Sequence, residues 1–255
     1  NKGEVLFNIS NFGGRSLIAT EDLPSFENNV FMLYNSNAGI SKFPQSTLAK
    51  MLTGKVVSVS PFIDPFTQGV DGSCSPKDFE TLLQMAYLYY TAPRFVEEEF
   101  AASMNQLKAV VPNLVSQPNF KLQTELVKVI YGDNPRRFVI SPEMLDKVSV
   151  PTIERVYKSL FSNAAGSVVR IVGNVNPEEI KPLVEKYIGS IPTGKKAPKW
   201  VDTKEELVKG HIHHHFDTQM TTPKSTVILV ASADMKNTLQ NTVVSSAVNY
   251  ILDLI

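Results

Sequence analysis

The clearest hydrophobic pattern along the chain predicts one strand followed by one capped helix. Residues 167–172 are β-branched and mostly apolar, which is typical of a strand covered on both faces. Asn176 followed by Pro177 predicts a helix start, because an asparagine side chain accepts a free N–H of the first turn and proline fits the first helical position. Apolar residues then recur at spacings of three and four, which predicts one buried helix face, and Gly189 predicts its end.

The remainder of residues 1–192 alternates between short strands and amphipathic helices. Serine–proline pairs at 75–76 and 141–142 each predict a capped helix start. Two of the strands flank a Pro/Gly loop, as an antiparallel pair does. The predicted strands are 5–9, 56–60 and 69–74, and the other predicted helices are 24–34, 45–52, 96–110, 119–131 and 152–161.

A basic Pro/Gly-rich segment then predicts a linker at 193–206. We therefore expect an α+β domain at 1–192, with helices layered on a mixed, largely antiparallel sheet. A second domain of the same type is expected to begin at 207–255, with strands at 210–216 and 225–230 and a helix that Asp234 caps. The missing initiator methionine and the uncapped apolar end lead us to expect both domains to be incomplete, the first without its first strands.

The balance of charged residues indicates which kinds of partner the chain does not bind. The chain has 25 basic and 25 acidic residues, so no general field favours nucleic acid or an anionic membrane, and we expect neither as a partner. No apolar run approaches the roughly 18 residues that a membrane helix needs. Cys74 is the single cysteine, which excludes an internal disulfide, and its place in a predicted strand indicates a small buried residue.

The four histidines lie together, and they are the one candidate metal site. Strand alternation would place His211, His213 and His215 on one face, which is a feasible ligand spacing for a transition metal. A catalytic zinc site usually adds ligands or an acid from another element, so the sequence favours a polar edge strand with adventitious metal affinity. Glycine-rich phosphate loops and a G-x-S-x-G elbow are both missing.

Several motifs, taken in order, resemble the insulinase/pitrilysin-type zinc metallopeptidases, to which the mitochondrial processing peptidases are similar. Residues 171–192 resemble the end of the first domain of these enzymes. The segment 42–54 is similar to the one that follows their zinc helix, 74–95 to their long helix and its following turn, and 132–142 to a later loop and helix start. The resemblance covers nearly the whole chain.

This resemblance implies that the chain itself has no catalytic site. Family members consist of two homologous halves that close around a peptide chamber, and the catalytic half carries zinc on an H-x-x-E-H motif. Here the motif positions fall at about 30–34 and the distal glutamate ligand near 105–106, where no zinc ligand stands. The resemblance therefore places zinc in the other half, with no catalytic residue and no cofactor in this chain. An arginine and a tyrosine that assist catalysis in the family would lie beyond Ile255, and the peptide-aligning edge strand of the active half corresponds to about 58–60.

Three hypotheses follow. The first is a fragment of a zinc metalloendopeptidase, inactive alone, that walls the chamber and contacts both peptide substrate and the catalytic half, in the same or a partner chain. The second is a catalytically dead binding or scaffold subunit of the same fold. The third and weakest is a metal binder that uses the histidine tract. We expect a bacterial protein of the periplasm or cell envelope, with the cytoplasm as the alternative.

Overall fold

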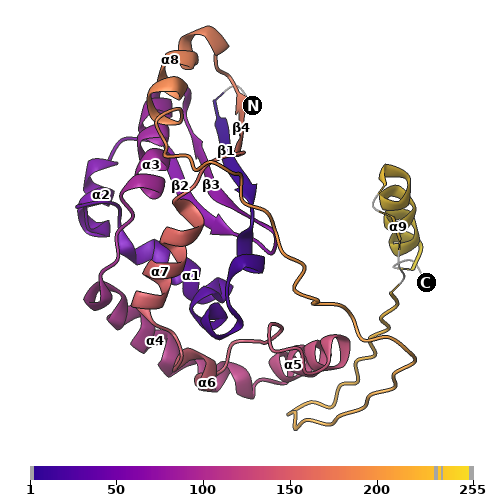
Figure 1. Cartoon of the computed structure of the whole chain (residues 1–255). Helices are drawn as coiled ribbons and strands as arrows, with labels where there is room; N and C mark the ends of the chain where they lie inside the picture. The colour runs from indigo at the N-terminus through magenta and orange to yellow at the C-terminus, as the bar shows by residue number, and fades with distance from the viewer. Residues whose placement is uncertain (1–2, 233–234, 237, 253–255) are drawn as a thin grey trace.

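A computed structural model describes residues 3–232, 235–236 and 238–252 of the chain. Most of the chain up to residue 192 forms one body in which helices cover a small sheet (Figure 1). The chain then continues as a long extended segment, which first runs along this body, and ends in a helix that stands apart from it (Figure 1). The α+β class expected from the sequence is confirmed.

The sheet has four strands in the order β2-β3-β1-β4. Its three pairings, β2 with β3, β3 with β1, and β1 with β4, are all antiparallel. The strands are β1 (Val5–Phe12), β2 (Val57–Ile63), β3 (Thr67–Cys74) and β4 (Val168–Gly173). The prediction that β4 is covered on both faces is wrong, because β4 is an edge strand and every second side chain lies on the uncovered face of the sheet.

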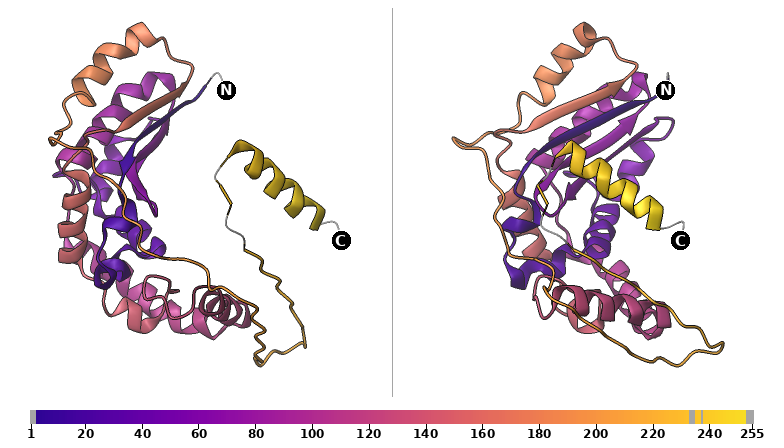
Figure 2. Two further views of the ribbon diagram at one scale, coloured as in Figure 1. Left: turned by 45° about the vertical axis from the view of Figure 1, so that its right-hand side comes forward. Right: turned by 90° about the vertical axis from the view of Figure 1, so that its right-hand side faces the viewer.

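Helices pack on one face of this sheet and leave the other face open (Figure 2). In β1 three of the four covered positions are the buried apolar residues Val5, Phe7 and Ile9, and the fourth is Asn11, which is buried and donates to the Asn163 carbonyl at 3.0 Å; the alternate positions are partly or fully exposed. This alternation of period two is what a strand with one buried face requires. The helices of the body are α1 (Asn28–Ala38), α2 (Gln45–Met51), α3 (Phe79–Thr91), α4 (Glu97–Ser116), α5 (Pro118–Tyr131), α6 (Pro142–Leu145), α7 (Val150–Phe161) and α8 (Pro177–Tyr187).

Local capping chemistry explains several helix starts. The Asn176 side chain accepts a hydrogen bond from the Glu178 amide at 3.1 Å, and Ser141 accepts one from Met144 at 3.1 Å, so these two predicted caps are confirmed. The helical segment also begins after Ser75, but the Ser75 side chain makes no capping bond and donates to the Asp78 carboxylate at 2.7 Å instead. The single helix predicted at 24–34 is wrong. A 3₁₀ segment (Thr20–Phe26) precedes α1, and the Glu27 carboxylate caps α1 by accepting from its first-turn amides.

The core lies between the sheet and α3 and α7. Leu82, Leu83 and Ile153 are fully buried there. Tyr157 of α7 stacks on Phe161 with ring centroids 4.1 Å apart, and the Tyr157 hydroxyl donates to the Tyr89 carbonyl at 3.0 Å. Because a buried hydroxyl needs a partner, this bond fixes α7 against α3.

The C-terminal part differs from expectation. Neither 210–216 nor 225–230 forms a strand, since no neighbouring strand in the described part of the chain supplies hydrogen bonds to them. Helix α9 (Leu239–Leu252) is present, whereas its expected cap Asp234 lies outside the described residues. The division into domains at 1–192 and 207–255 therefore stays a prediction. None of the described helices is long and apolar enough to cross a membrane.

Candidate functional site

The positions that would correspond to the zinc motif are filled by an apolar and aromatic cluster. Val30, Phe31 and Tyr34 of α1 are all buried. The Tyr34 ring packs edge-on against Phe100 of α4, with centroids 5.4 Å apart, and its hydroxyl donates to the Arg94 carbonyl at 2.6 Å. Burial raises the pKa of Tyr34 well above its usual value, so this hydroxyl stays protonated.

The expected position of the distal ligand is equally unsuited to a metal. On α4 Met104 is buried against this cluster, while Asn105 and Gln106 are exposed. Zinc in proteins takes thiolate, imidazole or carboxylate ligands, and none faces this cluster from the positions of the motif. The residues present here do not fit a zinc ion.

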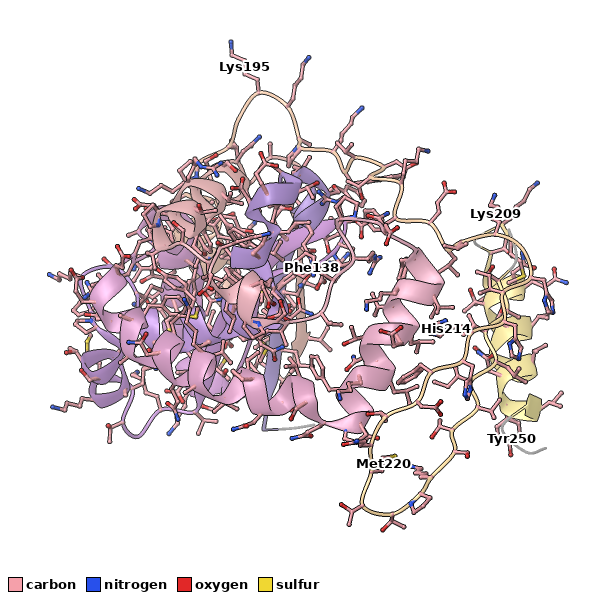
Figure 3. All side chains as sticks on the ribbon, turned by 90° about the horizontal axis from the view of Figure 1, so that it is seen from below. Phe138, Lys195, Lys209, His214, Met220 and Tyr250 are labelled. Carbon is pink, nitrogen blue, oxygen red and sulfur yellow. The ribbon has the colours of Figure 1, made fainter. Side chains whose placement is uncertain are left out.

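The histidine tract lies on the extended segment beside α5 (Figure 3). His214 Nε2 is 3.3 Å from the Glu125 carboxylate of α5, and His215 Nε2 is 3.5 Å from Asp217. The structure thus pairs single histidines with single acids and does not bring His211, His213 and His215 together as one strand face. Among the described residues no group of three His, Cys, Asp or Glu side chains could hold a metal ion.

We expect zinc to bind this chain without a high-affinity site. Titration calorimetry should give the same weak isotherm for the unmodified chain and for a His213→Ala/His215→Ala variant, because separate imidazole–carboxylate pairs do not form a tetrahedral site. A stoichiometric binding step that the double variant loses would instead support the histidine-tract metal binder.

The open face of the sheet carries a row of polar side chains across all four strands. The register places Ser60, Asp71, Asn8 and Arg170 side by side on β2, β3, β1 and β4. The Asn8 amide donates to Asp71 at 2.7 Å, and the Arg170 guanidinium donates to the Asn8 carbonyl oxygen at 2.9 Å. Hydrogen bonds therefore connect the positively charged Arg170 through Asn8 to the negatively charged Asp71.

Apolar side chains border this row. Leu6 and Val172 are 50% and 64% exposed on the adjacent row, opposite one another in the register. Together with the polar row they line a shallow hollow of about 500 Å³ on the face of the sheet opposite helices α3 and α7. A surface with apolar patches and both signs of charge can contact an extended peptide, and the serine hydroxyls that line it have no histidine beside them among the described residues of the hollow. Cys74 points to the buried face, where burial and the nearby Asp78 raise the pKa of its thiol to about 11.

The β2 edge, expected at 58–60 to correspond to a peptide-aligning strand, is interrupted by a proline. The Ser75 amide bonds to the Val56 carbonyl, and the Asp64 amide bonds to the Thr67 carbonyl. Val56 and Asp64 are both even-numbered, and in an antiparallel pair every second residue bonds to the partner strand. The odd-numbered residues of β2 therefore direct their backbone N–H and C=O groups away from β3. Pro61 is one of these and has no N–H to donate, which leaves a gap in this edge.

The sequence did not single out the open face. In β1 only residues 7–10 alternate between apolar and polar types, and Arg170 stands in an apolar stretch that resembles a fully buried strand. The cross-strand partners of Asn8 are 63 and 162 residues away, and no local pattern identifies them.

Comparison with known proteins gives both a family match and structural neighbours. The family model described as Peptidase M16 inactive domain matches residues 147–254. No curated protein sequence matches the chain. Similar solved structures include the periplasmic protease PqqL from Escherichia coli, at a TM-score of 0.64 and 16% identity over 82% of this chain.

Two further structures show the same fold. The ferredoxin protease FusC, solved in complex with Arabidopsis ferredoxin, matches at a TM-score of 0.59 and 15% identity over 81% of this chain. A protease from Helicobacter pylori matches at 0.62 and 12% identity over 82%. The chain spans 22% of PqqL, 22% of the FusC chain and 50% of the Helicobacter protease. Because the three identities are only 12–16%, these structures establish the fold of the chain and nothing about its function.

Proposed function

We propose that this chain, which is related to the M16 peptidases through their inactive domain, is part of the non-catalytic half of a zinc metallopeptidase. Its role is to wall a substrate chamber, contact peptide and pack against the catalytic half. The observation that carries the proposal is the Tyr34 cluster, which occupies the motif positions with apolar and aromatic side chains in a fold shared with proteases. Zinc then belongs to the other half, where it supplies the activated water.

The open sheet face is the surface we assign to peptide contact. It is the one face of the described sheet without a helix layer, and its exposed Leu6 and Val172 supply apolar contact. The polar row from Asp71 to Arg170 supplies donors and acceptors for a peptide backbone. The gap at Pro61 argues against strand addition at β2, so contact through the face of the sheet is favoured over contact through this edge.

The intact parent protein provides the test. We expect it to cleave unstructured peptides, to lose this activity on incubation with a zinc chelator and to regain it when zinc is restored. Lack of any metal-dependent cleavage by the intact parent would overturn the enzymatic proposal. That outcome would favour the second hypothesis, a binding or scaffold subunit, which the filled motif positions also suit.

A second arm of the same experiment addresses peptide contact. In the parent, Arg170→Gln is expected to raise KM by about 10-fold or more with little change in kcat, because one hydrogen bond to a charged group contributes about 1.5–3 kcal/mol. Arg155→Gln is the matched control, since Arg155 lies on helix α7, is exposed and pairs with Asp22 at 2.7 Å. Equal kinetics for the two variants would exclude Arg170 from peptide contact.

We also propose a bacterial periplasmic or cell-envelope location for the parent. The support is the family resemblance alone, and the cytoplasm remains the alternative. Subcellular fractionation with an antibody against this chain separates the two.

A further inference from the structure

The predicted linker is held against the body of the protein at its start. The Gly194 amide donates to the Asn163 side-chain oxygen at 2.6 Å, and the Asn163 side-chain amide donates to the Lys196 carbonyl at 2.8 Å. Further on, the Trp200 ring contacts Phe66 edge-on with centroids 5.3 Å apart. A polypeptide that links two domains freely makes few such contacts.

The same segment is held more strongly around Glu205. Arg136 Nε donates to Glu205 Oε1 at 2.9 Å, and the Thr203 hydroxyl donates to the same oxygen at 2.7 Å. Arg137 Nε lies 2.7 Å from the other carboxylate oxygen. Burial alone would raise the pKa of Glu205, but the hydrogen bonds from Arg136 and Thr203 and the two arginine charges lower it overall, so the carboxylate is ionised at neutral pH.

Arg136 connects this carboxylate to the body. Its side chain is only 9% exposed, and its two remaining nitrogens donate to the Ile18 carbonyl at 2.9 Å and to the Arg15 carbonyl at 2.7 Å. The guanidinium therefore links three parts of the chain: the loop before α6, the short 3₁₀ segment Gly14–Leu17 with the following Ile18, and the linker. Buried charge pairs persist only with such additional hydrogen bonds.

The segment ends in contacts with α5 and the loop after it, and beyond Gly210 the partly exposed His214–Glu125 pair, at 3.3 Å, is one more contact with α5. The Asn134 side chain donates to the Lys204 carbonyl at 3.1 Å, and the Val208 amide donates to the Ile130 carbonyl at 2.8 Å. Two residues later, Gly210 has a φ of +111°, and no atom would lie within 4 Å of an added Cβ. The backbone is thus both permissive and unobstructed at Gly210.

We infer that residues 193–208 are a fixed strap, closed by the Arg136–Glu205–Arg137 cluster, and that the pivot for the following segment is at Gly210. This inference goes beyond the proposed function and does not depend on whether the parent is a peptidase. It moves the expected point of flexibility from 193–206 to the residues after 208. The strap then fixes the point from which the following segment starts, whereas its orientation can change at Gly210.

Timed tryptic digestion of the whole chain, with cleavage sites identified by mass spectrometry, tests the strap. Lys199 and Lys204 lie inside it, and Lys209 lies at its end. We expect cleavage after Lys209 to be at least about 10-fold faster than after Lys199 or Lys204, since proteolysis requires local opening. Equal rates at the three lysines in the unmodified chain would overturn the strap.

The cluster is tested by Glu205→Ala, with Glu206→Ala as the matched control, because Glu206 is the exposed neighbour. We expect Glu205→Ala to bring cleavage after Lys204 to within about threefold of Lys209, and Glu206→Ala to leave the ratio unchanged. Equal behaviour of the two variants would overturn the role of the cluster. Cleavage after Lys158 in α7 reports global unfolding. If cleavage after Lys158 becomes faster in Glu205→Ala, the milder Glu205→Gln variant is measured instead. A Lys204-to-Lys209 rate ratio between those of Glu205→Ala and the unmodified chain then supports the cluster, and a ratio equal to that of the unmodified chain overturns it.

Discussion

The Gly69→Ala substitution is expected to lower the free energy of unfolding of the chain by about 3 kcal/mol or more, at the upper end of what overpacking costs. Gly69 lies in β3 opposite Ser10 of β1. An added Cβ would lie 1.9 Å from the Ile9 carbonyl oxygen and 2.9 Å from the Ser10 Cα. Both are backbone atoms of the paired strand, so no rotamer change relieves the overlap, and β1 and β3 would have to separate.

Urea unfolding followed by circular dichroism measures this effect. Gly3→Ala is the control, because no atom lies within 4 Å of a Cβ at Gly3, and its midpoint should match that of the unmodified chain. A Gly69→Ala midpoint within error of the control would show that the two strands are not paired as closely as described.

The Tyr157→Ala substitution is expected to lower the free energy of unfolding by about 3–5 kcal/mol, as large aromatic truncations in cores do. Tyr157 is buried, stacks on Phe161 at 4.1 Å and packs edge-on against Phe95 at 5.6 Å. Tyr157→Phe keeps the rings and removes only the bond to the Tyr89 carbonyl, so it should cost about 0.5–1.5 kcal/mol.

The same unfolding measurement separates the two contributions. Tyr250→Ala on α9 is the control, since that ring is 67% exposed and surface substitutions usually change stability by about 0.5 kcal/mol or less. If Tyr157→Phe proved as destabilising as Tyr157→Ala, the hydroxyl rather than the ring packing would be the larger contribution.

The parts of the fold predicted correctly from sequence are those that local chemistry determines. Asn176 and Ser141 cap helices through bonds to amides two and three residues away, so their own neighbourhood suffices to identify them. The helix predicted at 24–34 failed at its boundary because Glu27, which is not a strongly preferred cap, provides the cap in the structure. The segments 210–216 and 225–230 have strand-like sequences, but a strand also requires a neighbouring backbone.

The functional surfaces depend on contacts between distant residues. Arg136 and Glu205 are 69 positions apart, and Arg170 and Asn8 are 162 apart, so neither pair has a local signature. The family resemblance assigns the motif positions to residues of α1, and the structure shows that Tyr34 and its neighbours there form a packed core.

Pro61 has a consequence for assembly as well as for peptide binding. A sheet with two free edges can join to a second copy, edge to edge, and so extend into a continuous ladder. At β2 such a ladder would lack one donor in its middle, because Pro61 occupies an outward position. A single imino acid thereby disfavours self-association through β2 while leaving the pairing of β2 with β3 intact.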